Sequence, residues 1–326
     1  MGVALAKIFR EIKARNMESE LSLVKKVGGI ICLLFMLQVC PCPAQEIQHR
    51  EIAMVSDTQA PLWIEKLFLK SHDNERATAS IFDQIVQLRP SVLFILGDVT
   101  SWGAKERKWS AMDRYLKRCR ESGIPVHALL GNHDVMGNAR NGESNFLGRF
   151  PDFVKTGYYQ VVDSIAIVML NSNFRKMTKQ EVEIQQKRYR ETLASLDLDP
   201  GVKVIVVTCH HAPYSNSKTV GSSIPVQEHF VPLFLQTRKC RLFITGHAHA
   251  FEHFNMSGKD FLVIGGGGGL HQPLGHDLAD LQPDYKPLFH FLTLTRSAGH
   301  LIVNSWQLRN DYSGVDKRSV VDLIVE

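Results

Sequence analysis

The sequence predicts an α/β fold in which a single domain contains two sheets. Along the first half of the chain, short apolar runs rich in β-branched residues alternate with stretches of helical period, as in β-α-β units whose strands are buried between helices. Towards the C-terminus, strand-like runs follow one another. The composition, with 44% hydrophobic and 22% charged residues among 326, is that of a globular protein, and it excludes disordered, collagenous and coiled-coil chains.

The first 44 residues are predicted to be a signal peptide or N-terminal leader that lies outside the domain. An apolar run at 27–39 follows two lysines and is shorter than the roughly 20 residues that a membrane-spanning helix needs. Ala44 then offers a small residue for cleavage. Acylation of Cys40 and an uncleaved N-terminal anchor are the alternatives. We therefore expect an exported protein, periplasmic or extracellular, that contacts a membrane only through such an anchor.

The formal net charge of +5 gives little support to a nucleic-acid partner. Six basic and three acidic residues lie in the leader, so residues 45–326 carry only +2. No basic helix or Lys/Arg cluster lies near the motifs described below, and we expect no nucleic-acid polymer as a partner. Cys119, Cys209 and Cys240 are the only cysteines after the leader. Because three thiols cannot all pair, a disulfide framework is not expected.

The predicted elements of the first half follow the β-α-β pattern. Apolar runs predict strands at 52–55, 92–96 and 126–130, and stretches of helical period predict helices at 74–88 and 105–121. Asn74 is the expected N-cap of the first helix, and prolines are the expected stops of both helices. A loop is expected over the Gly- and Asn-rich residues 137–149.

The second half is predicted to contain two helices and most of the strands. Strands are expected at 158–162, 165–170, 202–208, 241–245, 261–264, 288–295, 301–306 and 320–325, and helices at 178–195 and 226–236. No repeat, low-complexity tract or linker interrupts residues 45–326. We therefore expect these residues to form one domain.

Residues that can bind a metal ion follow five of the predicted strands. They are Asp57 and Gln59, Asp98, Asn132 and His133, His210, and His247 and His249. Ligand sites in α/β sheets form beyond the carboxyl ends of strands, where loops converge. Glycines at 97, 131 and 246 permit tight turns before three of these groups. Carboxylate, amide oxygen and imidazole without thiolate suit Mn, Fe or Zn, so the sequence predicts a metal site here.

The same residues form ordered motifs that resemble a known family. Asp57-x-Gln59, Gly97-Asp98, Gly131-Asn132-His133-Asp134, His210 and Gly246-His247-x-His249 look like the five motifs of the calcineurin-like metallophosphoesterases. The similarity spans residues 50–255, and the stretches HHAPYSNS and GHAHAFEH resemble purple-acid-phosphatase-like members. The glycines at 265–269 are predicted to form a turn at the rim of the site. The resemblance implies a four-layer α/β/β/α sandwich of two mixed sheets flanked by helices.

The resemblance also implies two metal ions and a ligand set for each. The first ion would be held by Asp57, Gln59, Asp98 and His249. Asp98 would bridge to the second ion, which Asn132, His210 and His247 would complete. Two cations about 3.5–4 Å apart can clamp a phosphate and lower the pKa of a water molecule enough to give metal-bound hydroxide near neutral pH. We therefore expect a metal-dependent hydrolase of phosphoric esters, a phosphatase or phosphodiesterase, that acts on a small phosphorylated substrate.

His133 is the residue to which the resemblance assigns a catalytic role without metal binding. It would lie over the leaving-group or phosphate oxygen, where an imidazolium can protonate a departing alkoxide. Asp134 is expected to orient His133 or a metal ligand. His211 is left open between a contact to substrate and simple packing.

Two positions depart from the family pattern. Gln59 stands where most members have His, and it favours a harder ion such as Mn or Mg, as in the Asp-x-Gln members that resemble manganese-dependent nucleotide-diphosphate hydrolases. Ser101 stands where purple acid phosphatases have Tyr, so we predict no iron-tyrosinate colour. A catalytically silent phosphate- or nucleotide-binding protein on the same fold is the alternative function, and a DNA-repair-type nuclease is a third. A silent protein would be expected to have a broken ligand set, whereas only the first motif varies here.

Overall fold

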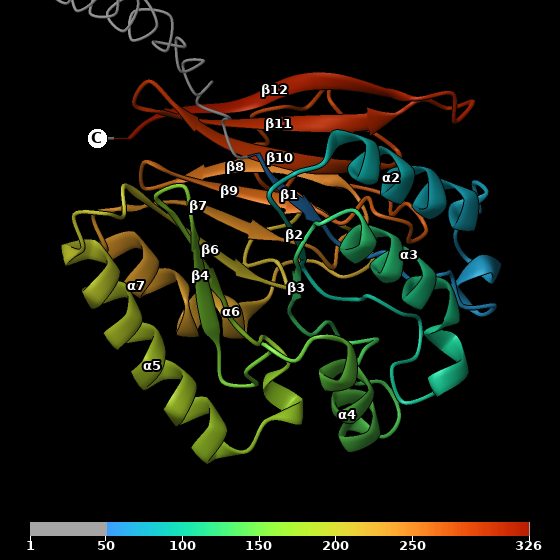
Figure 1. Cartoon of the computed structure of the whole chain (residues 1–326), viewed down its shortest axis with the longest axis horizontal. Helices are drawn as coiled ribbons and strands as arrows, with labels where there is room; N and C mark the ends of the chain where they lie inside the picture. The colour runs from blue at the N-terminus through green and yellow to red at the C-terminus, as the bar shows by residue number, and fades with distance from the viewer. Residues whose placement is uncertain (1–50, 326) are drawn as a thin grey trace, which may run out of the picture. The chain divides into compact units, whose positions relative to one another are not determined.

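The computed structural model describes residues 51–325 of the chain, which form two six-stranded mixed sheets (Figure 1). The predicted leader at 1–44, with Cys40, and the domain boundary at residue 45 lie outside the described residues. The strand order is β12-β11-β10-β1-β2-β3 in the first sheet and β4-β5-β6-β7-β9-β8 in the second. Among the described residues, no helix is both long enough and apolar enough to cross a membrane.

The first sheet combines a parallel half with an antiparallel half. Its parallel strands are β1 (Ile52–Val55), β2 (Val92–Ile95) and β3 (Val126–Ala128). Its antiparallel strands are β10 (His290–Ser297), β11 (His300–Leu308) and β12 (Val315–Ile324). The sheet therefore joins strands from both ends of the described chain.

The second sheet has parallel strands at its centre and an antiparallel strand at each edge. Its strands are β4 (Tyr158–Val162), β5 (Ile165–Met169), β6 (Val204–Cys209), β7 (Cys240–Thr245), β8 (Phe251–Met256) and β9 (Lys259–Ile264). β5, β6, β7 and β9 pair in parallel, whereas β4 and β8 pair antiparallel to their neighbours. Parallel strands end at the same edge, so the loops after β6 and β7 meet there.

Helices cover the outer face of each sheet, while the inner faces pack on one another. In β1, Ile52 and Met54 belong to the apolar core between the sheets, whereas Ala53 and Val55 face the helix side. That outer face is covered by α2 (Asn74–Leu88) and α3 (Ser110–Glu121) (Figure 1). The second sheet is covered by α5 (Lys179–Leu198), α6 (Ile224–His229) and α7 (Val231–Gln236). The predicted four-layer α/β/β/α sandwich is confirmed.

The predicted loop at 137–149 is wrong, because α4 (Ala139–Arg149) occupies most of it. The Asn138 side chain caps this helix by accepting a hydrogen bond from the Asn141 amide at 3.1 Å. Phe146 is fully buried against the α3 side of the core. A Cβ on Gly142 would lie 2.2 Å from the Asp134 carbonyl oxygen, so this glycine allows close packing instead of marking a loop.

Three further differences have local causes. The sequence missed β8 because Glu252 and His253 interrupt its apolar pattern, although both side chains are buried with hydrogen-bond partners. The predicted helix at 226–236 is divided into α6 and α7 around Phe230, next to Pro232, which cannot donate a backbone hydrogen bond. Asp73, and not Asn74, is the N-cap residue of α2.

Three short 3₁₀ helices complete the described elements. They are η1 (Glu65–Leu67), η2 (Glu106–Lys108) and η3 (Phe174–Lys176). η1 and η3 lie in loops that follow strands of the first and second sheet, and both contribute to the cavities described below.

Candidate metal centre

The predicted ligands come together where the carboxyl ends of strands from both sheets meet. The loops after β1, β2 and β3 carry Asp57, Asp98 and Asn132, and the loops after β6 and β7 carry the histidines. Several hydrogen bonds join the loops of the two sheets. The ring Nδ1 of His210 lies 2.9 Å from the Leu96 carbonyl oxygen, and the His247 amide donates to Asp57 Oδ2 at 2.9 Å.

The backbone is strained at three of the predicted ligands. Asp57, Asp98 and His247 have positive φ angles of 59°, 49° and 69°. Residues with a side chain seldom adopt this left-handed region, and such strain is concentrated at functional sites. Each residue follows a strand directly or by a short turn, so the unusual angle redirects its side chain out of the sheet and into the site.

Glycines before the ligands leave no room for a side chain. A Cβ on Gly246 would lie 1.9 Å from Ser56 Oγ and 2.4 Å from Asp57 Oδ2. A Cβ on Gly131 would lie 2.1 Å from Asp98 Oδ1. The turns predicted at these glycines are therefore also close approaches between loops of different strands.

The residues predicted for the second ion surround a common point. His210 Nε2 lies 3.2 Å from Asp98 Oδ2 and 3.1 Å from Asn132 Oδ1. Ligand atoms of Asp98, His210 and His247 all lie within 4.8 Å of one another, which is compatible with one metal ion. This cluster contains three of the four residues predicted for that ion, and the fourth, Asn132, is in contact with it.

The electrostatics of this cluster favour a cation. Burial alone would raise the pKa of Asp98, but the charges of His210 and His133 hold it well below its usual value. Burial alone would lower the pKa of His210, but the charges of Asp98 and Asp57 raise it to about 10. Burial and the neighbouring His211 and His210 lower the pKa of His247. A metal ion takes the place of a proton at such sites, because it binds the same lone pairs.

The residues predicted for the first ion are also in contact. His249 Nε2 lies 3.4 Å from Asp57 Oδ1, and both side chains are almost fully buried. Asp57 Oδ1 has no hydrogen-bond partner among the described residues. An ionised oxygen that is buried without a partner is costly unless a cation or water binds it. This atom is therefore free to act as a metal ligand.

The Gln59 amide has one orientation that satisfies its surroundings. In that orientation, the amide nitrogen donates to the Asp57 and Asp98 carbonyl oxygens at 3.1 and 3.0 Å. The amide oxygen then lies 3.3 Å from His249 Nε2, on the side of the predicted first ion. Oxygen and nitrogen donors without thiolate, together with the unpaired Asp57 oxygen, fit two ions of the Mn, Fe or Zn type.

His133 lies at the mouth of this cluster. Its amide donates to Asp98 Oδ1 at 2.7 Å, and its Nδ1 lies 3.2 Å from the Ser101 carbonyl oxygen. Its Nε2 lies 3.9 Å from both Asp98 Oδ2 and Glu65 Oε1. The ring is thus held beside the ligands, and Ser101 supports it through its backbone.

Among the described residues, the Asp134 carboxylate has no hydrogen bond to the ring of His133 or to the side chain of a predicted ligand, and it contacts the backbone next to Asp98 and Asn132 instead. Its carboxylate accepts hydrogen bonds from the backbone amides of Val99, Thr100 and Gly131 at 2.8–3.2 Å. Burial and the nearby charge of Asp98 raise the pKa of Asp134 to about 7. Asp134 therefore ties the loop after β2 to the loop after β3.

His211 packs against neighbouring residues and does not join the ligand cluster through its ring nitrogens. Its Nδ1 lies 2.8 Å from Ser172 Oγ, and its ring centroid lies 4.4 Å from that of His247. Burial and the adjacent His210 lower its pKa to about 3. His211 is thus a neutral ring that packs against His247, and because it also lines one of the cavities described below, a contact to substrate stays open as well.

The Gly-rich turn at 265–269 lies against the site, and Asn74 holds it there. The Asn74 amide donates to the carbonyl oxygens of Gly268 and Gly269 at 2.8 and 2.9 Å. A Cβ on Gly269 would lie 2.4 Å from the His249 ring. No pattern in the sequence indicates this role, because Asn74 lies almost 200 residues before the turn.

Two cavities open at the cluster. One of about 360 Å³ is lined by the predicted ligands Asp98, Asn132, His247 and His249, by His133, and by the η1 segment. The other, of about 440 Å³, shares Asn132 and His247 with the first and extends to Arg175 and Lys176. A phosphate at the cluster would therefore have room on both sides.

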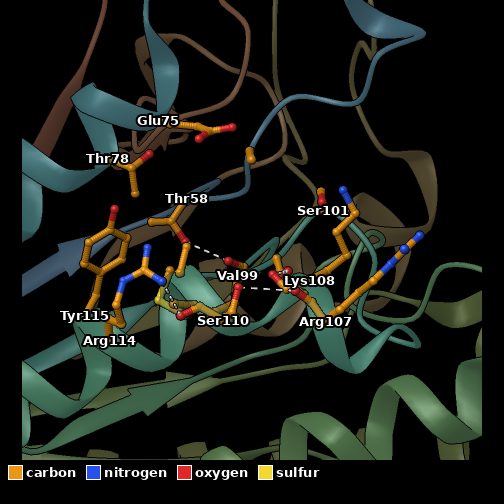
Figure 2. A pocket seen from close by; sticks show the side chains of 14 residues that line it. Thr58, Glu75, Thr78, Val99, Ser101, Arg107, Lys108, Ser110, Arg114 and Tyr115 are labelled. Carbon is orange, nitrogen blue, oxygen red and sulfur yellow. Dashed lines mark hydrogen bonds between the residues drawn. The ribbon is translucent and has the colours of Figure 1, made fainter.

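A third cavity of about 300 Å³ lies beside the same loops but contains none of the predicted ligands (Figure 2). Two hydrogen bonds form part of its wall, from Thr58 Oγ1 to the Val99 carbonyl oxygen and from Thr100 Oγ1 to the Lys108 carbonyl oxygen. Its charged lining residues are Glu75, Arg107, Lys108 and Arg114. The cavity is therefore separate from the metal cluster.

Two mixed sheets with a cluster of oxygen and nitrogen ligands at their strand ends define the metallophosphoesterase fold. The sequence matches the calcineurin-like phosphoesterase family over residues 51–251, and the chain belongs to this family. No protein of curated function matches the sequence.

Solved structures with this fold include enzymes and a protein with an anchoring role. The chain is similar to a purple acid phosphatase from yellow lupin (Lupinus luteus) seeds, with 16% identity and a TM-score of 0.62, over 83% of this chain and 53% of that chain. It therefore spans about half the length of that enzyme. It is also similar to GAP50, the anchor in the inner membrane complex of Plasmodium, with 16% identity and a TM-score of 0.60, over 84% and 88%. A dimetal phosphatase from Danio rerio has 13% identity and a TM-score of 0.52, over 84% and 98%.

Proposed function

We propose that this protein is a hydrolase of phosphoric esters that uses two metal ions, one held by Asp57, Gln59, Asp98 and His249 and one by Asp98, Asn132, His210 and His247. The observation that carries the proposal is the convergence of these side chains from loops of both sheets, with Asp57 Oδ1 buried and without a hydrogen bond among the described residues. Membership of the phosphoesterase family supports it. When bound, two such ions clamp a phosphate, offset its charge and make a water molecule acidic enough to attack phosphorus.

The chain's own residues then position the ions and handle the leaving group. Asp98 would contact both ions in this proposal, which is supported by the 3.2 Å between its Oδ2 and His210 Nε2 and by the position of Gln59 beside its backbone. His133 would donate a proton from Nε2 to the departing alkoxide, since its Nδ1 side is turned to the Ser101 carbonyl oxygen. Gln59 adds a neutral oxygen ligand, and we propose that the first ion is Mn or another hard divalent cation.

Metal analysis combined with three substrates tests the proposal. The full chain would be loaded with Mn, Fe, Zn or Mg and assayed on a chromogenic phosphomonoester, a chromogenic diester and a nucleotide diphosphate. We expect two metal ions per chain and hydrolysis of at least one ester, with Mn the best metal. The enzyme proposal fails if no ester is cleaved with any metal. Activity only with two zinc ions would contradict the role given to Gln59.

A catalytically silent binding protein is the second candidate. The similarity to GAP50 shows that the fold also occurs in a protein described as an anchor. The intact ligand cluster favours the hydrolase, because a binding protein has no need of the unpaired Asp57 oxygen or of His133 beside the metal ligands. Metal binding without hydrolysis of any ester would favour the silent protein.

Export of the protein to the periplasm or exterior remains a proposal that rests on the apolar run at 27–39. Membrane contact only through an N-terminal anchor is proposed on the same grounds, whereas a small phosphorylated substrate and no nucleic-acid polymer are proposed from the motifs and the charge of the chain. Fractionation of cells and N-terminal sequencing of the purified protein would test export and membrane contact. Cleavage near Ala44 supports a signal peptide, whereas an intact N-terminus in the membrane fraction indicates the anchor.

A further inference from the structure

The segment at 62–69 exposes large apolar side chains beside the cavity of about 360 Å³ that His133 lines. Trp63 is 74% exposed, Leu67 is 65% exposed and Phe68 is 82% exposed. The segment includes η1, and its neighbour Ile64 is also exposed. Scattered apolar residues on a surface need no explanation, but four within six residues form a patch that indicates a binding function.

The patch reaches the cavity lined by His133 through one of its residues, Phe68. Leu69 and Val220 line the same cavity, and so do the predicted ligands Asp98 and His247. A phosphate bound at these ligands could therefore extend a substituent past His133 into the part of the cavity that Phe68 lines. Because His133 is placed to protonate the leaving group, that substituent is the leaving group.

The charges around the two cavities differ. Among the described residues that line the His133 cavity, there is no Lys or Arg, and Glu65 is the only carboxylate besides the predicted ligand Asp98. The cavity on the other side of His247 instead has Arg175 and Lys176 at its lining. If the leaving group carried a negative charge, Glu65 would repel it, and no Lys or Arg of this lining would offset the repulsion. An apolar leaving group would instead contact Phe68 and Leu69.

We propose that the cavity beside His133 binds the apolar organic group of a phosphate ester, with Phe68, Leu69 and Val220 as its contact surface. This inference rests on the proposed function and names the substrate class, a phosphate ester of an apolar alcohol. Burial of apolar surface supplies the binding energy, and the phosphate at the metal ions fixes the orientation.

A series of alkyl phosphates tests this substrate class. For the metal-loaded full chain, kcat/KM on monoesters from ethyl to octyl phosphate is expected to rise about twofold for each added methylene, since full burial of a methylene would give about fourfold. Phe68→Ser is expected to flatten this rise. Its side chain is exposed, so the change should not disturb folding. Leu198→Ser is the matched control, because Leu198 is 83% exposed at the end of α5 and away from the cavity.

Binding of alkylphosphonates, which cannot be hydrolysed at their P–C bond, separates this inference from the proposed function. Calorimetric titration should show that octylphosphonate binds more tightly than ethylphosphonate and that Phe68→Ser removes the difference. That result supports the inference even if no ester is cleaved. Equal binding and equal kcat/KM across the series would overturn it while leaving the hydrolase intact. Loss of binding to phosphatidylglycerol vesicles in Phe68→Ser, without any dependence on chain length, would also overturn it and identify the patch as a membrane-docking surface.

Discussion

Hydrogen bonds at one ring nitrogen hold His210 and His249 in an orientation that suits metal binding at the other nitrogen. Each Nδ1 lies within 2.9 Å of a backbone carbonyl oxygen, that of Leu96 for His210 and that of Leu270 for His249. A carbonyl can only accept, so each Nδ1 carries a proton, and each Nε2 is turned to the carboxylates. This arrangement fixes the ring orientation that a metal ligand requires.

Substitutions of Asp98 and His133 should separate metal binding from catalysis. Asp98→Ala is expected to remove most of the bound metal, because its carboxylate contacts His210 and is the ligand that we propose for both ions. His133→Ala is expected to retain both ions and to lose activity by about 10²- to 10⁴-fold, the usual contribution of a general acid. Elemental analysis and kcat of the two purified variants provide the check. Loss of metal in His133→Ala would show that His133 is a ligand.

His290 should make stability depend on pH. It is fully buried at the start of β10, where neither ring nitrogen has a hydrogen-bond partner among residues 51–325, and burial lowers its pKa to about 3 from the ordinary 6.5. Below pH 6.5 the unfolded chain therefore takes up a proton that the folded protein does not. The stability from a neutral His290 is fully present above that pH and is lost as the pH falls towards 3.

The expected size of this loss is about 2 kcal/mol between pH 7.5 and pH 5. Urea unfolding of the wild type and of His290→Asn at several pH values would measure it. The variant cannot take up the proton at this position, so the difference in free energy of unfolding between the two proteins should shrink as the pH falls. A constant difference would contradict the assigned pKa.

At the scale of elements, the short turns after the strands place the ligands. Gly246 directly follows β7 and lies very close to Ser56 and Asp57. A side chain at position 246 would therefore displace one of these two residues. The turn after β1 and the turn after β7 are therefore packed against each other, and each depends on the position of the other.

Gly246→Ala is expected to lower metal affinity by about 10- to 100-fold, as changes around metal ligands usually do. The added methyl group would push Asp57 Oδ2 from its place. Gly148→Ala in α4 is the control, because a Cβ there meets nothing within 4 Å. Metal titration of the two variants measures the difference, and equal affinities would show that the turn can relax.

The helix α4 is expected to be essential to the core although its sequence resembles a loop. Phe146 packs against Phe150 at 4.6 Å and Phe153 at 5.0 Å between ring centroids. Phe146→Ala should lower the free energy of unfolding by about 3–5 kcal/mol, the usual cost of removing a buried aromatic ring. Leu147→Ala should have a small effect, because that side chain is 48% exposed. Denaturant unfolding of both variants tests this, and equal losses would contradict the packing of α4.

At the scale of the whole domain, the cluster joins the two sheets. Asp57, Asp98 and Asn132 belong to loops of the first sheet, and His210, His247 and His249 belong to loops of the second. The packed core between the sheets brings these loops together, and metal ions bound between them would in turn link the sheets.

Metal binding should therefore raise the melting temperature of the domain. A ligand that binds only the folded state at 100 times its Kd stabilises it by about 2.7 kcal/mol. Thermal melts with EDTA and with excess Mn should differ by several degrees in the wild type, and Asp98→Ala should abolish most of the difference. An unchanged melting temperature in the wild type would contradict a site shared by the two sheets.

The fold class and the candidate ligands could be predicted from the sequence because their signals are local. Apolar runs followed by Asp, Asn or His mark strand ends, so Asp57, Asp98 and His210 stood out without any knowledge of the fold. Helix α4 was not predicted, because Gly142 resembles a loop residue in the sequence. This glycine lets the helix pack against the Asp134 backbone, a contact that composition does not reveal. Strand β8 was not predicted either, because Glu252 interrupts its apolar pattern. The hydrogen-bond partners that allow Glu252 to be buried, Ser215 and Asn216, lie far from it in the sequence.

The sequence by itself determined the α/β class, the order of most elements and the identity of the predicted ligands. Only the tertiary structure decided which groups meet. It placed Asp134 on backbone amides and Asn74 on the glycine turn, it turned the Gln59 oxygen towards His249, and it brought Phe68 to the same cavity as His133. The physical reason is that strand and turn propensities act between neighbours in sequence, whereas hydrogen bonds and cavities depend on the packing of loops from two separate sheets.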